Sequence, residues 1–324
     1  MNAYLITDDT IRMTIITKCD YYPNLTISIG QHTSALLKLE PVEPCESRWD
    51  AIRSCTYAGY IGSTTLPKEA LGEAIRGKAT MFISYVNESH SRNGLRPIDS
   101  RASSGRQPPH RLAVCVAPIA QFSSWPLLAR FFEWIGHLQF YEFAQMWIAH
   151  GATKFYLPVQ SITPEVDAML RIYENDPKIS IERMQWGLLP SSKSTSDEEN
   201  PNNQLLRSEL TLAINDCVLR ARGRAEYVSL LDLDEIIVIR NNLTLLQNLD
   251  SAIIDDRNVA VFIFRSSFGT FDVRYPLDLI AFFLYLGKCP SYSTPGLSVC
   301  TRERSECISG CFLVTKEVDG SYPP

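Results

Sequence analysis

The sequence predicts an α/β fold in which a mostly parallel sheet with helices on both faces follows a small β-rich domain. Short β-branched runs separated by Pro and Gly turns fill the first 86 residues. From residue 112 onward, apolar strand-like runs alternate with helical stretches, which is the pattern of a parallel sheet covered by helices. The length of 324 residues also indicates about two domains.

The β-rich domain is predicted over residues 1–86, with strands expected at IRMTIIT, LTISI, AIRSCTYAGYI and TMFISYV. Residues 87–111 hold five arginines, five serines and three prolines without apolar periodicity. Such a tract is typical of a solvated linker, and contact with phosphate or RNA is the other interpretation of its basic charge.

The α/β domain is predicted over residues 112–324. Its first strand is LAVCVAPI, followed by a helix from about Pro126 to His150 and, after Gly151, the strand TKFYLPV. The elements expected next are a helix near Glu165–Glu174, the strand KISIERM, a polar loop, a helix over Leu205–Arg222, the strand EYVSLLDL, the amphipathic stretch LTLLQNLDSAII and the strand VAVFIF.

Charge and hydropathy exclude several classes of partner. The net charge of −5 gives no general attraction to nucleic acid or to anionic membranes. Asp8 and Asp9 interrupt the position where a signal peptide needs an apolar core, and the apolar run 279–286 is about half of a bilayer span. Membrane association is therefore expected only through an anchor that this chain does not show.

Nine cysteines and three sequons bear on the compartment. A zinc site at the late trio Cys300, Cys307 and Cys311 is disfavoured, because CxxC-like spacing is missing and no histidine follows His150. Disulfides or plain thiols are favoured instead. The sequons begin at Asn24, Asn87 and Asn242. They fit a secretory protein, but about two would occur by chance in a chain with this much Asn, Ser and Thr.

The segment YVSLLDLDEIIV, residues 227–238, ends an apolar strand with the acids Asp232, Asp234 and Glu235. Ligands of open parallel sheets bind beyond the carboxyl ends of the strands. Residues two apart in a strand share a face, with their Cα atoms about 6.6 Å apart. Two carboxylates placed in this way suit a divalent cation with oxygen preference, which in turn would hold a diphosphate.

Two other interpretations of these acids stay open. The first is structural: the acids cap a following helix or pair with Arg240 and Arg265. The second follows from the resemblance of DLDEII to the first motif of haloacid-dehalogenase-type phosphatases. That family places the motif on its first strand and prefers Thr or Val where this chain has Ile236, and the pair Asp255-Asp256 follows too soon for its last motif. The phosphatase is therefore the weaker functional reading.

An ordered series of segments closely resembles the glycosyltransferase family 92 domain over about residues 112–271. The series consists of VCVAPI at 114–119, Trp125 and Phe132-Glu133-Trp134, HGATKFYLPV at 150–159, Trp186-Gly-Leu-Leu-Pro, and Gln204 followed by AINDCVLRARGRAEYVSLLDLDE.

The resemblance implies a GT-A glycosyltransferase, with a Rossmann-like nucleotide-binding sheet, an Asp-x-Asp (DxD) motif and a divalent metal, usually manganese. It implies a hexosyltransferase that moves galactose from UDP-galactose to fucose on N-glycans with inversion, in the Golgi or secretory-pathway membrane. The expected partners are a UDP-sugar and a glycan or glycoprotein acceptor.

Site residues carry over by position. The resemblance implies metal ligands at Asp232, Asp234 and Glu235, and donor contacts at Val114, Val116, Pro118, Asp216 and Asp232. For Asp216 two interpretations are equal: a donor-site residue or an acid on a helix surface. For Trp186, packing is favoured over sugar stacking.

The sequence also departs from the family. GT-A enzymes commonly use a late histidine as a metal ligand and a late acid as the base, yet every histidine precedes Asp232: His32, His90, His110, His137 and His150. No catalytic base is identified, and the family's downstream region is not recognised after Phe271. We therefore expect a carboxyl-terminal part that is truncated or atypical. The alternative function is a catalytically inactive relative that keeps the donor fold as a binding or structural module.

Overall fold

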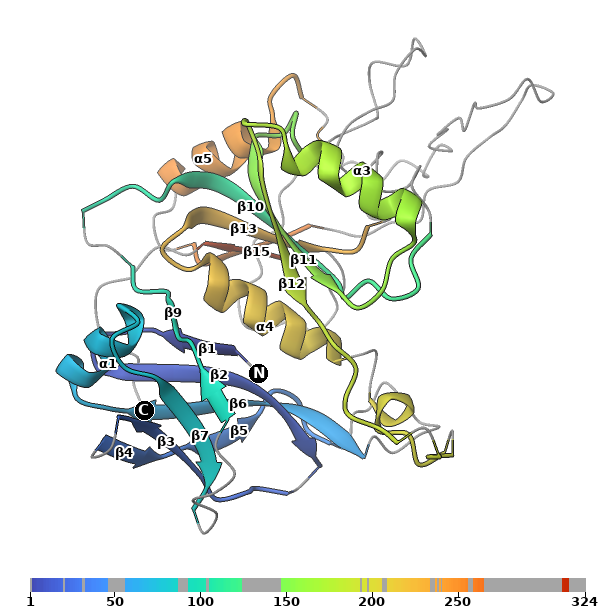
Figure 1. Cartoon of the computed structure of the whole chain (residues 1–324). Helices are drawn as coiled ribbons and strands as arrows, with labels where there is room; N and C mark the ends of the chain where they lie inside the picture. Colours follow the sequence, from blue (N-terminus) through green and yellow to red (C-terminus); the bar gives the residue numbers. More distant parts are fainter. Residues whose placement is uncertain are drawn as a thin grey trace.

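The fold has an amino-terminal pair of sheets and a carboxyl-terminal α/β sheet (Figure 1). The computed structural model describes residues 2–19, 21–30, 33–45, 56–86, 93–102, 105–123, 147–192, 194–196, 198–205, 209–233, 237, 239, 241–255, 259–264 and 311–314.

The amino-terminal region is a β-sandwich. One sheet has the order β5 (Lys38–Pro41), β6 (Tyr57–Thr65), β2 (Thr10–Lys18), β1 (Asn2–Leu5) and β9 (Ile98–Asp99). The other has the order β4 (Thr33–Leu36), β3 (Leu25–Ile29), β7 (Met81–Tyr85) and β8 (Asn93–Leu95), and helix α1 (Lys68–Ile75) joins β6 to β7. In β3 the apolar residues alternate with polar ones, so Leu25, Ile27 and Ile29 enter the core that both sheets share.

The predicted linker is partly structured. Residues 93–95 form β8, which pairs with β7, and residues 98–99 form β9, which lies parallel to β1. These short strands each extend the edge of one sheet of the sandwich. The polar composition did not indicate them, because an edge strand exposes most of its side chains.

The carboxyl-terminal sheet has the order β12 (Ser180–Gln185), β11 (Ala152–Val159), β10 (His110–Val116), β13 (Ala225–Leu231), β15 (Cys311–Val314) and β14 (Val261–Ile263). The first four strands pair in parallel, whereas β15 is antiparallel to both of its neighbours. The predicted mostly parallel sheet is confirmed, and β15 is an addition that the sequence did not indicate.

Helices cover both faces of this sheet, as predicted. The apolar residues of α3 (Pro164–Glu174) and α5 (Leu245–Asp255) pack in the core on one face. On the other face α4 (Leu210–Ala221) packs through Cys217 and Ala221. Of the helix expected over residues 126–150, the part from 126 to 146 lies outside the described residues, and residues 147–151 form turns.

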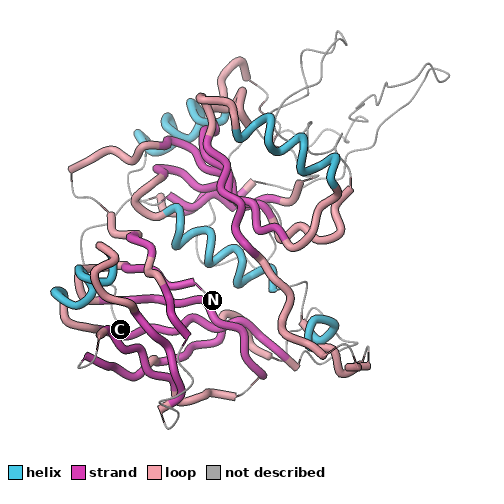
Figure 2. The backbone as a smooth tube through the Cα atoms, in the orientation of Figure 1, coloured by secondary structure: helices cyan, strands magenta, loops and turns pink. Residues whose placement is uncertain are grey.

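Helix α4 also packs against the sandwich, so it is buried between two sheets (Figure 2). Leu219 on α4 joins Tyr4 and Ile6 of the sandwich in one apolar cluster. The approach is close at Gly59 in β6, where a methyl group would lie 2.8 Å from Leu212 Cβ.

Two disulfides cross-link the structure. Cys115 in β10 is bonded to Cys217 in α4, with 6.1 Å between their Cα atoms, and Cys19 is bonded to Cys45 in the sandwich. The expectation of disulfides or thiols at the late trio stays a prediction, because none of these four bonded cysteines belongs to it. Cys300 and Cys307 lie outside the described residues.

Candidate functional site

The carboxyl ends of β10 and β13 form the candidate site. The two strands are neighbours in register, with Val116 opposite Leu231. Strand β11 lies on the far side of β10, so the chain leaves β10 in one direction while β13 borders it on the other. This reversal of strand order is the switch point at which open α/β sheets bind ligands.

Two of the predicted site residues meet at this edge. Pro118 follows the end of β10 and is half-buried, and Asp232 follows the end of β13 and is exposed. The register of the two strands therefore brings residues 114 positions apart to the same edge of the sheet.

The rest of the acidic motif cannot be placed. Asp234 and Glu235 lie outside the described residues, as do Arg240 and Arg265, the ion-pair partners of the structural interpretation. Their roles stay predictions.

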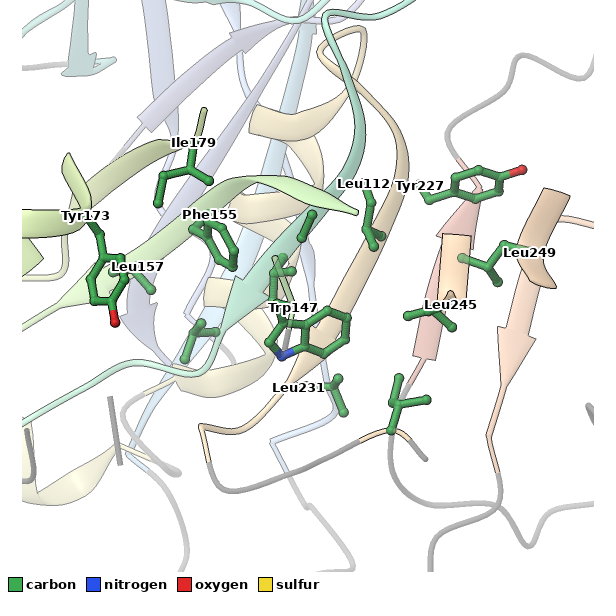
Figure 3. Packing of buried hydrophobic residues seen from close by; sticks show 14 of the residues in the cluster. Leu112, Trp147, Phe155, Leu157, Tyr173, Ile179, Tyr227, Leu231, Leu245 and Leu249 are labelled. Carbon is green, nitrogen blue, oxygen red and sulfur yellow. The ribbon is translucent and has the colours of Figure 1, made fainter. Parts of the chain in front are cut away.

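The side chains of Val114 and Val116 do not line this edge. They are 0% and 4% exposed and belong to the apolar core beneath α3 and α5. Leu231 and Trp147 belong to the same core (Figure 3). Packing thus occupies the valine side chains, whereas Pro118 lies at the end of β10, and donor contact at these three residues stays a prediction.

Asp216 is not on the helix surface, because its exposed fraction is 0%. It accepts hydrogen bonds from Asn2 Nδ2 at 3.0 Å, from Thr14 Oγ1 at 2.8 Å and from Arg220 Nε at 3.4 Å. Asn2 and Thr14 belong to the sandwich, so Asp216 faces the junction of the two regions. These contacts give it a structural role.

A second charged cluster lies beside Asp216. Glu182 in β12 is 2.7 Å from Arg220 Nη1 and 3.1 Å from Lys154 Nζ. Burial alone would raise the pKa of Glu182, but the hydrogen bond from Arg220 and the charge of Lys154 hold it below its usual value. Arg220 thereby joins β12, α4 and the sandwich through Glu182 and Asp216.

The loop after β10 adds a residue that the sequence did not indicate. Gln121 has a left-handed backbone, with φ of 51°, and its N–H donates to Ser161 Oγ at 2.7 Å. Non-glycine residues in the left-handed region of backbone conformation carry strain and are concentrated at functional sites. Glutamine in this conformation has no sequence signature.

Trp186 lies close to the same edge. It follows β12, is half-buried, and its N–H donates to the carbonyl of Val159 at the end of β11. This position is open to both packing and contact with a ligand.

The predicted metal ligands Asp232, Asp234 and Glu235 fit a hard divalent cation by their chemistry. Carboxylate oxygens are the ligands that manganese, magnesium and calcium prefer. Within the part of the chain that the structure describes, no group of three or more His, Cys, Asp or Glu side chains converges on one point. Two of the three predicted ligands lie outside that part.

Glu209 precedes α4 at the boundary with the sandwich and is buried. Its carboxylate lies against β6, since a methyl group on Gly59 would be 2.7 Å from Glu209 Oε2. Burial raises the pKa of Glu209 to about 7, while a backbone hydrogen bond from Gly59 opposes the rise.

Replacing Glu209 with glutamine is expected to stabilise the protein at pH 8 and to change little at pH 4. The folded-state pKa lies above the unfolded value of 4.5, so the wild type is most stable below about pH 4.5 and loses stability as the pH rises through about 7. The gain at pH 8 should be roughly 2–3 kcal/mol, measured by urea denaturation. Glu73→Gln, an exposed control, should show no such difference, and an equal gain at both pH values would contradict the assignment.

Comparison with known proteins gives one family. The model of glycosyltransferase family 92 matches residues 110–282, which is more than half of the chain and extends beyond Phe271. No curated protein sequence matches the chain significantly. Among the described helices, none is both long enough and apolar enough to cross a membrane.

Proposed function

This chain belongs to glycosyltransferase family 92, and from that premise we propose that it transfers a hexose, most simply galactose, from a UDP-sugar to a glycan acceptor such as fucose on N-glycans, with inversion. Family membership indicates a glycosyltransferase in general. The donor, the acceptor and the metal dependence are the proposed part.

The observation that carries the proposal is the position of Asp232. It follows β13 at the switch point of a mostly parallel sheet, beside the end of β10. This is where a Rossmann-like sheet binds a nucleotide, and it supports a GT-A type of donor site. In that site the end of β10 near Pro118 would border the nucleotide.

Asp232, Asp234 and Glu235 would hold a divalent cation, manganese by family resemblance. When bound, such an ion stabilises the negative charge that develops on a departing diphosphate. Asp232, which directly follows β13, would orient the donor relative to the acceptor. Positioning of this kind supplies much of the rate in transfer reactions.

The disulfides support a compartment for this activity. Disulfides persist in oxidising environments and are rare in the cytosol. Cys19–Cys45 and Cys115–Cys217 lie in the sandwich and in the α/β region, respectively. We therefore propose that the protein acts in the secretory pathway, in the Golgi.

Asp232→Asn tests the proposal. Manganese with UDP-galactose should raise the Tm of the wild type by ligand linkage, and the variant should lose that rise. Release of UDP in the presence of fucosylated N-glycans should fall by roughly a hundredfold in the variant, because charge stabilisation is lost. Glu198→Gln, an exposed acid of the same region, is the control and should retain both signals.

The Tm and UDP-release measurements together distinguish the transferase from the inactive binding module. A Tm rise without turnover would favour the inactive binding module over the transferase. If no UDP-sugar shifts the wild-type Tm, the donor site itself is wrong.

A further inference from the structure

Helix α4 has two buried faces and lies between the sandwich and the sheet (Figure 1). Leu212, Asp216 and Leu219, spaced by four and three residues, lie on the face that contacts the sandwich. Cys217 and Ala221 lie on the face that packs on the sheet. Successive residues of a helix point about 100° apart, so the neighbours Asp216 and Cys217 face different regions. Two adjacent residues of one helix are therefore fixed to the two parts of the fold.

Asp216 is the polar anchor of α4 on the sandwich. Its carboxylate accepts hydrogen bonds from Thr14 Oγ1 at 2.8 Å and from Asn2 Nδ2 at 3.0 Å. Asp216 and Thr14 are 0% and 3% exposed. Hydrogen bonds to a buried carboxylate are stronger than those between neutral groups, and breaking one leaves charge without solvent. A displacement of β2 is therefore expected to carry α4 with it.

Cys217, the next residue, anchors α4 covalently to the sheet. Its disulfide partner Cys115 lies in β10, three residues before Pro118. In β13, Leu230 lies opposite Cys115 and two residues before Asp232. The bridge therefore reaches the sheet at the two strands whose carboxyl ends form the candidate site, and it does so close to those ends.

Apolar packing holds α4 to the sheet less firmly than it holds α3 and α5. The opposite core includes the large side chains of Phe155, Leu245 and Leu249. Small side chains bury less apolar area and so stabilise less. We therefore expect the bridge, together with the 2.7 Å ion pair between Arg220 and Glu182, to set the position of α4 on the sheet. The core on the α4 face consists largely of small side chains, and its members are Ala113, Cys115, Tyr156, Met184, Cys217, Ala221, Ala225 and Val228.

We propose that the sandwich controls donor binding at the candidate site through α4, with Asp216 and the Cys115–Cys217 bridge as positioning residues. We call the series of contacts from Thr14 through Asp216 and the bridge to the β10 end at Pro118 the α4 path. A displacement of the sandwich moves α4 at Asp216, and the bridge moves the end of β10 with it. The identity of the donor, a nucleoside diphosphate sugar, rests on the proposed function, whereas the α4 path consists of contacts within the folded chain.

The first test changes only the sandwich end of the α4 path. Thr14→Val keeps the shape of the side chain and removes the hydroxyl that donates to Asp216. The dissociation constant for UDP-galactose with manganese, measured by calorimetry at a temperature where the variant is folded, should rise about fivefold or more. Thr26→Val is the matched control, because the hydroxyl of Thr26 donates to the carbonyl of Ser84 within the sandwich, and it should bind the donor like the wild type.

The second test asks whether the effect of Thr14→Val passes through the disulfide. In the double variant Cys115→Ala/Cys217→Ala, Thr14→Val should change the donor dissociation constant by less than about twofold, because effects along one path are not additive. A merely structural role of Thr14 would lower stability and leave the dissociation constant of the folded protein unchanged. The Cys19–Cys45 double alanine variant lacks a bridge within the sandwich and should retain the full effect. Equal effects with and without the Cys115–Cys217 bridge would refute the α4 path.

A measurement without ligand separates failure of the α4 path from failure of the proposed donor. Ile119 lies just after β10, and its N–H donates to the carbonyl of Pro158 at 2.9 Å. Thr14→Val should speed hydrogen exchange at Ile119 about fivefold or more, and Thr26→Val should not. Unchanged exchange in Thr14→Val would overturn the proposal whatever ligand binds. If exchange is faster but no UDP-sugar binds the wild type, the coupling stands and the donor of the proposed function is wrong.

Discussion

Asp216→Ala is expected to lower the free energy of unfolding by about 3 kcal/mol or more, because it removes a buried carboxylate that three donors share. Asn2 and Thr14 would each lose their acceptor at the junction. Arg220 would keep its ion pair with Glu182 at 2.7 Å, so the guanidinium would not be left without a partner. The loss should appear in urea denaturation of the full chain, together with faster proteolysis between the sandwich and the α/β region.

Asp167→Ala is the matched control. Asp167 also pairs with an arginine four residues later on its helix, but its side chain and that of Arg171 are 30% and 68% exposed. Its second partner, Arg183, is 27% exposed and would keep its ion pair with Glu174. Exposed pairs contribute about 0–1 kcal/mol, so this variant should remain close to the wild type. Equal losses in the two variants would mean that Asp216 does not hold the junction.

Removing the Cys115–Cys217 bridge by double substitution to alanine is expected to cost about 4–5 kcal/mol. The bridge closes a loop with a sequence separation of 102, and chain-entropy arguments give this magnitude for a loop of about 100 residues. Both cysteines are buried, at 2% and 1% exposure, so lost packing adds to the cost. Thermal unfolding under non-reducing conditions measures the loss.

The Cys19–Cys45 double alanine variant is the comparison. Its separation of 26 predicts a smaller loss, about 3.5 kcal/mol by the same argument. Its cysteines are half-buried, so a mild reductant should open this bridge first. A smaller loss for Cys115–Cys217 than for Cys19–Cys45 would contradict the assignment of the longer cross-link as the stronger one.

Local patterning was enough to predict most of the fold that positions the site. Alternation in LTISI gave β3, and the apolar run around Val114 gave β10, since each pattern reflects side chains that are close in sequence. The edge strands β8 and β9 were missed because short exposed strands carry no such pattern. Strand β15 was missed because its partners β13 and β14 come from distant parts of the chain.

The sequence likewise predicted only part of the candidate site. The apolar run that ends before Asp232 places this acid at a strand end, and the sequence predicted that much. It also suggested donor contacts for Val114 and Val116, whose side chains prove to be core residues because only the tertiary structure shows which face α3 and α5 cover.

By itself the sequence determined the family and the alternation of strands and helices, because both depend on patterns of residues that are close together in the chain. The tertiary structure decided the role of Asp216, whose partners Asn2 and Thr14 lie 214 and 202 residues away. It likewise decided which cysteines pair. These depend on contacts between distant segments, which form only when the sandwich, α4 and the sheet pack together.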